Sequence, residues 1–516
     1  MRSQVSTMSY LELLRLASAE AVVVISALVV LAIGLINRRA TVVAEVSSAR
    51  PPTRAARTAV ATGWCSLVAA IGIAIAIAAV LMQPRNASLF DGMLVITPLT
   101  SLFKIICLAL AFFTVCLVRS EKSLRHPGEY LAMILLATAG LMLLVGSEEL
   151  LMIFIGLELL GLSLYVMAAF DKIDVRSAEA GLKYFLFGST SSAFTLFGIS
   201  LIYGMSGTTG LAAISDKLAA APVQPLLATG IIMTLIGFAF KIAAAPFHLW
   251  APDAYQGAPI PSAAFIASGS KVASFVVLGK IVLVGFAPAH GSSAWHAMAA
   301  GWSPVLAVLA ALSIVIGNLV ALAQSNVRRL LAYSAVAHAG YTLLGLIAGS
   351  RDGFSATLFY AAVYAITLVG AFGVVAVVHS ETGGDDLKNF SGLAARAPLL
   401  AGCMAIFMLS LAGIPPLAGF FGKFYLFSAA LRAGGNYGLL WLIALALFGS
   451  FVSLYYYLMV LKAIFVDEPS LTTPSSPDRP LPDLLQRITV ATLAAAILLL
   501  GLMPDTLAAR ILAAVP

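Results

Sequence analysis

The stretch from Lys241 to Lys271, KIAAAPFHLWAPDAYQGAPIPSAAFIASGSK, decides the fold. Two apolar runs meet in it, and each carries a lysine at a depth where a membrane helix normally carries no charge. A charged side chain near the bilayer centre costs at least about 2.5 kcal/mol, so it is retained only where it is paired, hydrated or deprotonated. Pro246 removes a helix hydrogen bond shortly after Lys241, and a helix broken at this depth must line protein or water. The stretch therefore predicts a broken membrane helix beside buried ionisable groups.

The composition places the whole chain in a membrane. Of its 516 residues, 61% are hydrophobic and only 10% are charged, and the mean hydropathy of +1.01 is far above that of a soluble domain. An apolar window of about 20 residues spans the hydrocarbon core. We predict an all-α polytopic membrane protein with about fourteen such helices, near residues 20, 60, 100, 130, 150, 178, 226, 260, 302, 330, 354, 397, 438 and 487.

The sequence carries no motif for a metal or a nucleotide. The four cysteines lie scattered through apolar runs without the spacing of metal ligands, and no GxGxxG motif follows a strand pattern. We therefore predict no catalytic, cofactor-binding or metal-binding residue on this chain.

The net charge of +7 is a topology signal rather than a nucleic-acid site. Counted over alternating loops, 17 of the 30 lysines and arginines fall on one side of the membrane and 7 on the other. The richer side is cytoplasmic by the positive-inside rule. With an even number of helices, both termini are then predicted to lie outside.

Six cations remain inside the predicted spans, and all six are lysines: Lys104, Lys183, Lys241, Lys271, Lys280 and Lys423. A desolvated lysine can lose its proton, whereas arginine effectively cannot. The bias favours groups that change their protonation state. Lys104 and Lys280 lie near the ends of their spans, and we expect them to extend toward the membrane surface.

Glu158 is the carboxylate that we place near mid-membrane. It lies ten residues after Glu148, which is about 15 Å into a core of about 30 Å. Lys183 lies about 10 Å from the cytoplasmic end of the next helix, and we expect Glu158 and Lys183 to pair across these antiparallel neighbours. Charges about 6 Å apart in such a pair interact by about 3 kcal/mol. Glu179, four residues before Lys183, is a competing local partner.

Two histidines and a second lysine extend this set. Lys271 lies about 15 Å into the eighth helix, again at the midplane. His248 stands in the broken segment, within reach of Lys241 and Lys271 in a compact packing, and an unperturbed pKa of about 6.5 suits a proton relay. His338, in SAVAHAGY, is also mid-span. For both histidines, a structural hydrogen bond to the backbone is the alternative.

The twelfth helix has the same pattern as the seventh. In LSLAGIPPLAGFFGKFYLF the helix breaks from Gly413 to Pro416, at the Pro415–Pro416 pair, and resumes with Lys423, as the seventh helix breaks at Pro246. The two broken helices lie five helices apart. Five-helix repeats are necessarily inverted in the membrane, as in many transporters that hold ions at broken helices.

Four regions follow from this periodicity. Residues 1–127 form a three-helix scaffold, and helices four to eight form the first five-helix repeat over residues 128–286. Helices nine to thirteen form the second repeat over residues 300–466. A proline- and serine-rich connector and a last helix occupy residues 467–516.

Three segments resemble those of a known family. They are similar to the antiporter-like membrane subunits of respiratory complex I, most closely to the N type of the bacterial proton-pumping NADH:quinone oxidoreductase. The segments are SLSLYVMAAFDKIDVRSAEAGLKYFLFGSTSSAFTLFGISLIYGMSGTTGL, KIAAAPFHLWAPDAYQGAPIPSAAFIASGSKVA and LAGIPPLAGFFGKFYLF.

The resemblance implies fourteen helices in inverted repeats, with helices seven and twelve discontinuous. It assigns the family's glutamate to Glu158, its sixth-helix lysine to Lys183, its central lysines to Lys241 and Lys271, and its terminal lysine to Lys423. The M type typically has a glutamate where Lys423 stands, and the L type has a long carboxy-terminal extension for which this chain has no room. Both departures favour the N type.

The resemblance also implies a function in a bacterial inner membrane. Protons are expected to enter at Glu158 and Lys183, to pass Lys241, His248 and Lys271, and to leave by Lys423, driven by quinone reduction in a neighbouring subunit. Expected partners are the other membrane subunits of complex I, including neighbouring antiporter-like subunits, and lipid. Quinone and NADH are used by the parent complex, and no cofactor is expected on this chain.

Two other functions fit part of the pattern. Multisubunit cation/proton antiporters share the broken-helix lysine motifs, so a subunit of such an antiporter is the alternative. A purely structural spacer between pumping subunits is disfavoured, because such a role does not explain why several charges are retained at mid-membrane despite their free-energy cost.

Overall fold

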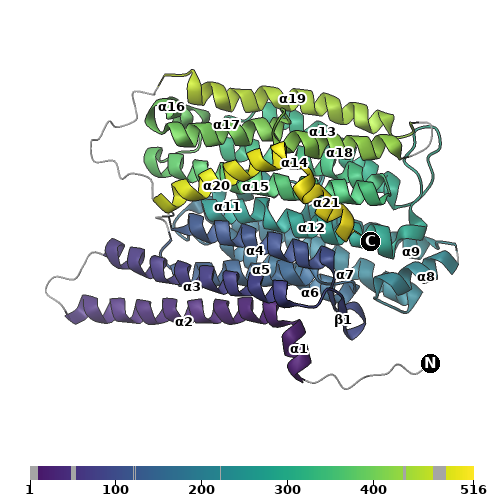
Figure 1. Cartoon of the computed structure of the whole chain (residues 1–516), viewed down its shortest axis with the longest axis horizontal. Helices are drawn as coiled ribbons and strands as arrows, with labels where there is room; N and C mark the ends of the chain where they lie inside the picture. The colour runs from purple at the N-terminus through teal and green to yellow at the C-terminus, as the bar shows by residue number, and fades with distance from the viewer. Residues whose placement is uncertain are drawn as a thin grey trace.

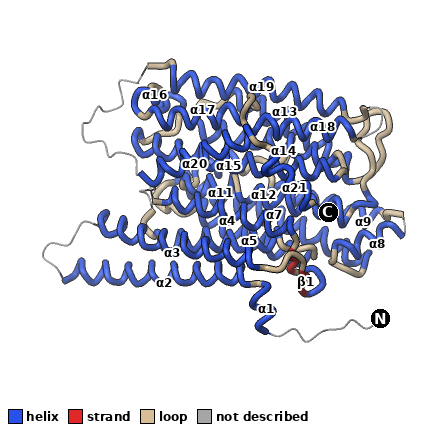
Figure 2. Tube along the Cα trace, in the orientation of Figure 1, coloured by secondary structure: helices blue, strands red, loops and turns tan. Residues whose placement is uncertain are grey.

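The chain, in a computed structural model, is described over residues 10–47, 54–119, 121, 124–220, 222–433, 437–468 and 484–515. It is helical almost throughout, with one short strand pair (Figures 1 and 2). Among these residues, twelve helices are long and apolar enough to cross a membrane, and two apolar helices are shorter. Each of the two shorter helices is followed by a second short helix. The fold therefore confirms about fourteen membrane elements, including the two discontinuous helices that the sequence predicts.

The first half of the chain holds the scaffold and the first broken helix. Its elements are α1 (Tyr10–Leu16), α2 (Ser18–Ser47), α3 (Arg54–Met82), β1 (Ala87–Leu89), η1 (Phe90–Gly92), β2 (Leu94–Ile96), α4 (Pro98–Val118), α5 (Pro127–Val145), α6 (Leu150–Ala168), α7 (Val175–Ser206), α8 (Leu211–Ala220), α9 (Pro225–Lys241), α10 (Ala251–Gly257), α11 (Ile260–Ala267), α12 (Gly269–Lys280), the π-helix η2 (Ile281–Gly285) and η3 (Ala287–Ala289).

The second half of the chain holds the second broken helix. Its elements are α13 (Trp302–Leu322), α14 (Val327–Ile347), α15 (Arg351–Thr382), η4 (Leu387–Phe390), α16 (Leu393–Arg396), α17 (Pro398–Ala412), α18 (Ala418–Arg432), α19 (Leu440–Phe465), α20 (Leu484–Leu502) and α21 (Asp505–Ala514). The connector predicted from residue 467 lies outside the described residues from 469 to 483.

The first break begins earlier than the sequence predicts. We expected the seventh helix to run to Pro246, but α9 ends at Lys241. Ala243 adopts a φ of 58°, a left-handed conformation that a helix cannot continue. The amide of Ala245, freed by the break, donates to Ser313 Oγ on α13 at 2.8 Å. A neighbouring helix thus satisfies the backbone at membrane depth, as the absence of water there requires.

The eighth span is also interrupted, which the sequence did not predict. Ser268 separates α11 from α12 with a non-helical φ of −114° and ψ of −83°. The span also ends in a π-helical turn immediately after Lys280. Lys271 therefore lies in the first turn of a new helix rather than in the middle of a continuous one.

Three spans form the centre of the bundle. The windows of α11–α12, α14 and α15 are each 94% buried, whereas the window of α2 is 28% buried. α15 packs against α4, α11, α12, α14, α17, α18 and α20. Side chains on these central helices face protein instead of lipid, so polar groups can be retained there.

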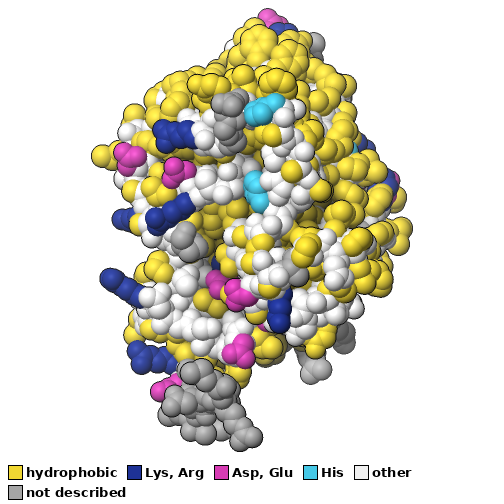
Figure 3. Space-filling view, turned by 90° about the vertical axis from the view of Figure 1, so that its right-hand side faces the viewer, with side chains coloured by type: hydrophobic (Ala, Val, Ile, Leu, Met, Phe, Trp, Pro, Cys, Tyr) yellow, Lys and Arg dark blue, Asp and Glu magenta, His cyan; other side chains and the backbone are white. Residues whose placement is uncertain are grey.

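Elements from both ends of the chain meet at one end of the bundle. α1, α21 and the β1–β2 hairpin lie toward the right of Figure 1, as an even number of crossings requires. Figure 3 looks onto this end, where charged side chains gather toward the left and lower part and hydrophobic side chains cover the right flank. We refer to it as the terminal end, and to the opposite end as the connector end.

Candidate functional site

Glu158 and Lys241 share one small polar cavity. The cavity has a volume of about 10 Å³ and lies between α6, α7 and α9, which is space for about one water molecule. Glu158 accepts a hydrogen bond from Ser192 Oγ at 2.5 Å. Lys241 Nζ lies 5.9 Å from the centre of the Tyr165 ring. The mid-membrane carboxylate is therefore adjacent to the lysine at the first break.

Two glycines make room for this arrangement. A Cβ on Gly161 would lie 3.3 Å from Lys241 Nζ, and a Cβ on Gly188 would lie 2.0 Å from the Tyr165 hydroxyl. The second distance is an overlap that no side chain tolerates. Small residues at these positions on α6 and α7 allow the polar groups to enter a tightly packed helix interface.

The predicted pair between Glu158 and Lys183 is wrong. Lys183 Nζ lies 2.6 Å from Glu179 Oε1 and 2.7 Å from Asp253 Oδ2, and its side chain is 39% exposed. Lys183 precedes Ser192, the residue that touches Glu158, by nine residues, or about 13 Å along α7. The amine therefore cannot reach mid-membrane. The competing local pair with Glu179 is the one that forms.

Asp253, which the sequence interpretation passed over, connects three helices at the connector end. It accepts from Lys183 on α7 and from Arg329 Nη1 on α14 at 2.7 Å each, and it lies on α10. The available signal was an acidic residue inside an otherwise apolar broken helix, PDAY. Asp253 fixes the second part of the broken helix to its neighbours.

Arg328, the residue before Arg329, forms a second set of contacts between α14 and the broken segment. The buried guanidinium donates to the carbonyl oxygens of Tyr255 and Ala258 and lies 3.3 Å from Asp385 Oδ2. Asp385 also lies 2.7 Å from His379 Nδ1. Burial alone raises the pKa of Asp385, but the hydrogen bond with His379 and the charge of Arg328 together hold that pKa below its ordinary value.

His248 is buried in the broken segment near α14. Its ring centre lies 6.2 Å from that of Tyr333. Its Nδ1 has no hydrogen-bond partner in the described part of the chain. The ring is positioned inside the protein as predicted, but its relay role stays a prediction.

Lys271 lies at the centre of the bundle. Its Nζ donates to the carbonyl oxygen of Ala335 on α14 at 2.8 Å, and it lies 5.5 Å from the centre of the Tyr364 ring on α15. An ammonium over an aromatic face is stabilised by the ring's quadrupole. Lys271 is thus held between α14 and α15, and no carboxylate among the described residues pairs with it.

His338 on α14 and Lys423 on α18 are the remaining two predicted relay residues. His338 Nδ1 lies 2.6 Å from Tyr360 Oη, and its Nε2 lies 2.9 Å from Tyr457 Oη. Lys423 Nζ donates to the carbonyl oxygen of Ala412 at 2.9 Å and to Ser450 Oγ at 2.7 Å. Ala412 is the last residue of α17, so Lys423 reaches back across the Pro415–Pro416 break to a helix C-terminus. The helix dipole stabilises a cation there.

The predictions for Lys104 and Lys280 are wrong. Both side chains are buried rather than extended to the surface. Lys104 Nζ lies 2.6 Å from Glu20 Oε1. Lys280 Nζ lies 3.4 Å from Glu148 Oε1 and donates to the carbonyl of Val145 at the end of α5 at 3.0 Å. Carboxylates and helix-end carbonyls keep both cations inside.

Several buried polar atoms near the first break and near Lys271 have no partner in the described part of the chain. In the described part of the chain, the hydroxyls of Tyr184, Tyr255 and Tyr364 and His248 Nδ1 are buried and make no hydrogen bond to protein. Buried polar groups are almost always satisfied by protein or by water. We therefore expect ordered water along this interior, which would connect the group around Lys241 to the group around Lys271.

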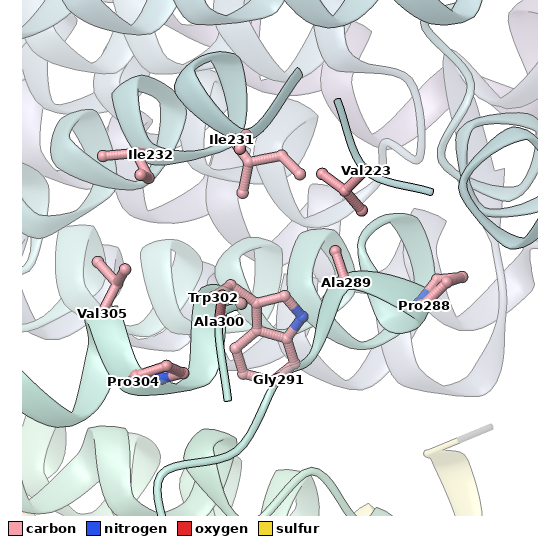
Figure 4. A pocket seen from close by; sticks show the side chains of 12 residues that line it. Val223, Ile231, Ile232, Pro288, Ala289, Gly291, Ala300, Trp302, Pro304 and Val305 are labelled. Atoms are coloured by element: carbon pink, nitrogen blue, oxygen red, sulfur yellow. The ribbon is translucent and has the colours of Figure 1, made fainter. Parts of the chain in front are cut away.

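A larger apolar pocket lies away from these residues. It has a volume of about 460 Å³ and opens between α9 and the start of α13 at the terminal end (Figure 4). Val223, Ile231, Ile232, Trp302 and Val305 line it, and no lining side chain is ionisable. The pocket therefore offers no proton chemistry and is not the candidate site.

A known protein family matches the part of the chain that contains the broken helices and the buried lysines of the predicted relay. The model of the NADH:quinone oxidoreductase/Mrp antiporter membrane family matches residues 147–453, which include every predicted relay residue from Glu158 to Lys423. The chain belongs to this family.

Within the family, three similar proteins are informative. NADH-quinone oxidoreductase subunit N 2 of Acidobacterium capsulatum is 45% identical over 515 residues, covering 97% of this chain and 98% of that protein. A chain of respiratory complex I from Thermus thermophilus with bound aureothin is 34% identical, with a TM-score of 0.74 over 95% of this chain and 98% of that chain. A chain of the Mrp complex from Dietzia sp. has a TM-score of 0.74 at 21% identity over 96% of this chain and 97% of that chain.

These similarities confirm the resemblance expected from the three motifs. The two solved structures share the fold of this chain over almost its whole length. The identity to the Acidobacterium capsulatum protein extends over 97% of this chain, so it includes most of the first hundred residues. The likeness to the Mrp complex shows the fold alone.

Proposed function

We propose that this chain is a proton-translocating membrane subunit of a NADH:quinone oxidoreductase in a bacterial inner membrane, without a redox centre of its own. The family and the relatives named subunit N support the assignment. The observation that carries the mechanism is the row of buried lysines at Lys241, Lys271 and Lys423. Each lies beside an aromatic ring and none is neutralised by a direct carboxylate pair in the described residues.

Protons enter at the connector end and move along this row. Lys183, with its partner Asp253, is accessible there and supplies the entrance. Glu158 and Lys241 form the first buried station.

Water and His248 connect the first station to Lys271. His338 connects Lys271 to Lys423, from which protons leave. Each lysine alternates between its charged and neutral forms.

The energies are of the right size for coupling. Moving one charge against about 150 mV requires about 3.5 kcal/mol. Two charges about 5.5 Å apart at an effective dielectric constant of about 20 interact by about 3 kcal/mol. A change in the contact between Glu158 and Lys241 is therefore large enough to gate the transfer of one proton.

The face of α6 and α7 requires a protein partner. Leu162 on α6 and Phe185 and Phe197 on α7 are exposed, and Glu158 beside them is not fully buried. A carboxylate at this depth is not stable against lipid. We infer that a neighbouring membrane subunit covers this face, so that Glu158 lies at a subunit boundary where a conformational signal can reach it.

The two broken helices also support the proposed five-helix repeats. In the first, Lys241 is the last residue of α9, and in the second, Lys423 contacts the last carbonyl of α17. Each break therefore places a lysine at the negative end of a half-helix, as expected of ion sites in inverted-repeat transporters.

The test is substitution of Lys241 in the assembled complex. We expect Lys241→Ala and Lys241→Arg both to lose proton pumping, since arginine keeps the charge but does not release a proton. Lys217→Ala, on the exposed side of α8, is the matched control and should pump normally. The measurement is protons pumped per NADH oxidised in liposomes. Native pumping by Lys241→Ala at native quinone-reductase turnover would refute this route.

A further inference from the structure

His338 lies between two tyrosine hydroxyls in the most buried part of the chain. Its Nδ1 faces Tyr360 on α15 at 2.6 Å, and its Nε2 faces Tyr457 on α19 at 2.9 Å. The Tyr457 hydroxyl lies 2.5 Å from Ser334 Oγ on α14. These four side chains, which we name the hydroxyl row, are joined by consecutive hydrogen bonds across three helices.

Each end of the hydroxyl row lies on or against a helical turn that is adjacent to one of two buried lysines. Ser334 immediately precedes Ala335, whose carbonyl oxygen accepts the hydrogen bond from Lys271. At the other end, the Tyr360 ring packs on the backbone of α18. A Cβ on Gly422 would lie 2.5 Å from Tyr360 Cδ2, and Gly422 immediately precedes Lys423. The row therefore runs from the turn of α14 that binds Lys271 to the turn of α18 that carries Lys423.

Each member of the row can both donate and accept a proton. A hydroxyl has one donor and two acceptor positions, and a neutral imidazole has one N–H and one bare nitrogen. With a hydroxyl at each ring nitrogen, one tyrosine donates to His338 and the other accepts from it. Exchanging the tautomer reverses both bonds without leaving a charge behind.

We propose that Ser334, Tyr457, His338 and Tyr360 carry the proton between Lys271 and Lys423, with the two tyrosine hydroxyls as proton-transfer groups in their own right. This inference rests on the proposed function, because it requires proton transfer between those lysines.

The transfer balances atom by atom. A proton from the Lys271 ammonium binds the Ser334 oxygen, the Ser334 hydroxyl proton passes to Tyr457, and the Tyr457 proton passes to His338 Nε2. His338 Nδ1 then releases its proton to Tyr360, whose original hydroxyl proton passes on to Lys423. Every O–H or N–H bond that breaks along the row is replaced on the same residue.

One proton has moved, both tyrosines are neutral, and His338 has changed tautomer. Rotation of the ring and hydroxyls resets the row.

Water or a lysine rotation completes the two ends. The Tyr364 hydroxyl is buried and has no partner among the described residues. Its ring lies 5.5 Å from Lys271 Nζ and 5.0 Å from the His338 ring centre. A water molecule bound there would satisfy this hydroxyl and bring a proton carrier next to Lys271.

Phenylalanine substitutions test the row by removing one oxygen atom each. Tyr360→Phe and Tyr457→Phe interrupt it on either side of His338. Tyr456→Phe is the matched control: its ring lies beside that of Tyr457, at 4.6 Å between centres, but its hydroxyl donates to Asn318 instead of His338. All three variants are made in the full complex and reconstituted in liposomes.

We expect Tyr360→Phe and Tyr457→Phe each to pump at least twofold fewer protons per NADH, while Tyr456→Phe pumps at the native ratio. The double variant should lose no more than the more affected single variant, because the two groups act in series. Slowed proton transfer should also enlarge the solvent deuterium isotope effect on pumping.

Native ratios in both row variants would overturn the proposal, as would an equal loss in Tyr456→Phe. A lower ratio with an unchanged isotope effect would also overturn it, because that result is expected if the hydroxyls only hold His338 in place.

Lys271→Ala in the same preparation separates two kinds of failure. If Lys271→Ala loses pumping while the row variants retain it, the hydroxyl row is refuted and the proposed function stands. If Lys271→Ala itself pumps at the native ratio, proton transfer through these lysines is refuted.

Discussion

Among the described residues that line the shared cavity, Glu158 is the only ionisable carboxyl facing Lys241, and Glu158→Gln removes its charge while leaving the shape unchanged. The glutamine carbonyl can still accept the hydrogen bond from Ser192. One water molecule in the cavity places the two charges about 5.5 Å apart, and the interaction lost is then about 3 kcal/mol at an effective dielectric constant of about 20. That energy corresponds to about a hundredfold change in an equilibrium.

The assay compares two activities of the reconstituted complex. Proton pumping per NADH reports the membrane path, and NADH oxidation with a soluble electron acceptor reports assembly of the remainder of the enzyme. We expect Glu158→Gln to lower the pumping rate by about ten- to a hundredfold, because the charged form of Lys241 loses its stabilising partner. Oxidation with the soluble acceptor should remain native.

Glu179→Gln is the matched control for this change. Glu179 contacts Lys183 at 2.6 Å and is 55% exposed, and Lys183 keeps Asp253 as a partner when Glu179 is neutralised. An exposed ion pair contributes about 1 kcal/mol or less, so pumping should change by less than about fivefold. Native pumping by Glu158→Gln, or an equal loss in Glu179→Gln, would refute the assignment of Glu158 to Lys241.

Three further substitutions test other parts of the structure. Lys104→Met leaves Glu20 buried without its counter-ion and should cost about 3–5 kcal/mol, seen as a lower unfolding temperature in detergent; an unchanged temperature would contradict the buried pair. Lys423→Arg keeps the charge but not the ability to release a proton, so we expect a folded protein that no longer pumps, and pumping by this variant would exclude Lys423 from the route. The pKa of Asp385 lies below its ordinary value of about 4, so its stabilisation is present at neutral pH and disappears as the pH falls through that range. Asp385→Asn should therefore unfold at a lower temperature at pH 7 and show a smaller further loss at acid pH.

The positions of the helices could be predicted from the sequence because hydrophobic length and proline determine them locally. Pro415 and Pro416 remove backbone donors, and they follow Gly413, whose left-handed φ of 86° ends α17. The first break has no glycine at the corresponding place. Its start is set by the left-handed Ala243 and by Ser313, a hydrogen-bond partner on a helix far along the chain. No local pattern before Pro246 indicates either feature.

The partners of the buried charges could not be predicted in the same way. The depth of Glu158 follows from counting residues, but the side chain that it meets depends on how α6, α7 and α9 are shifted along one another. Lys183 seemed the natural partner on the adjacent helix, whereas Lys241 comes from a helix that packs behind α7. Other ion pairs between distant segments, such as Lys280 with Glu148, could not be predicted from the sequence for the same reason.

The contrast between Arg328 and the buried lysines connects the two parts of the fold. The sequence suggested that cations inside the protein are lysines only, yet Arg328 is buried as well. Its guanidinium is held by two carbonyl oxygens and a carboxylate, so its charge is fixed and the position of α14 is fixed with it. Lys271 has three donors but one hydrogen bond to protein in the described part of the chain, which leaves donors for water and for the release of a proton. Arg328, at the connector end, therefore fixes the position of α14. The proposed proton route passes along this same helix.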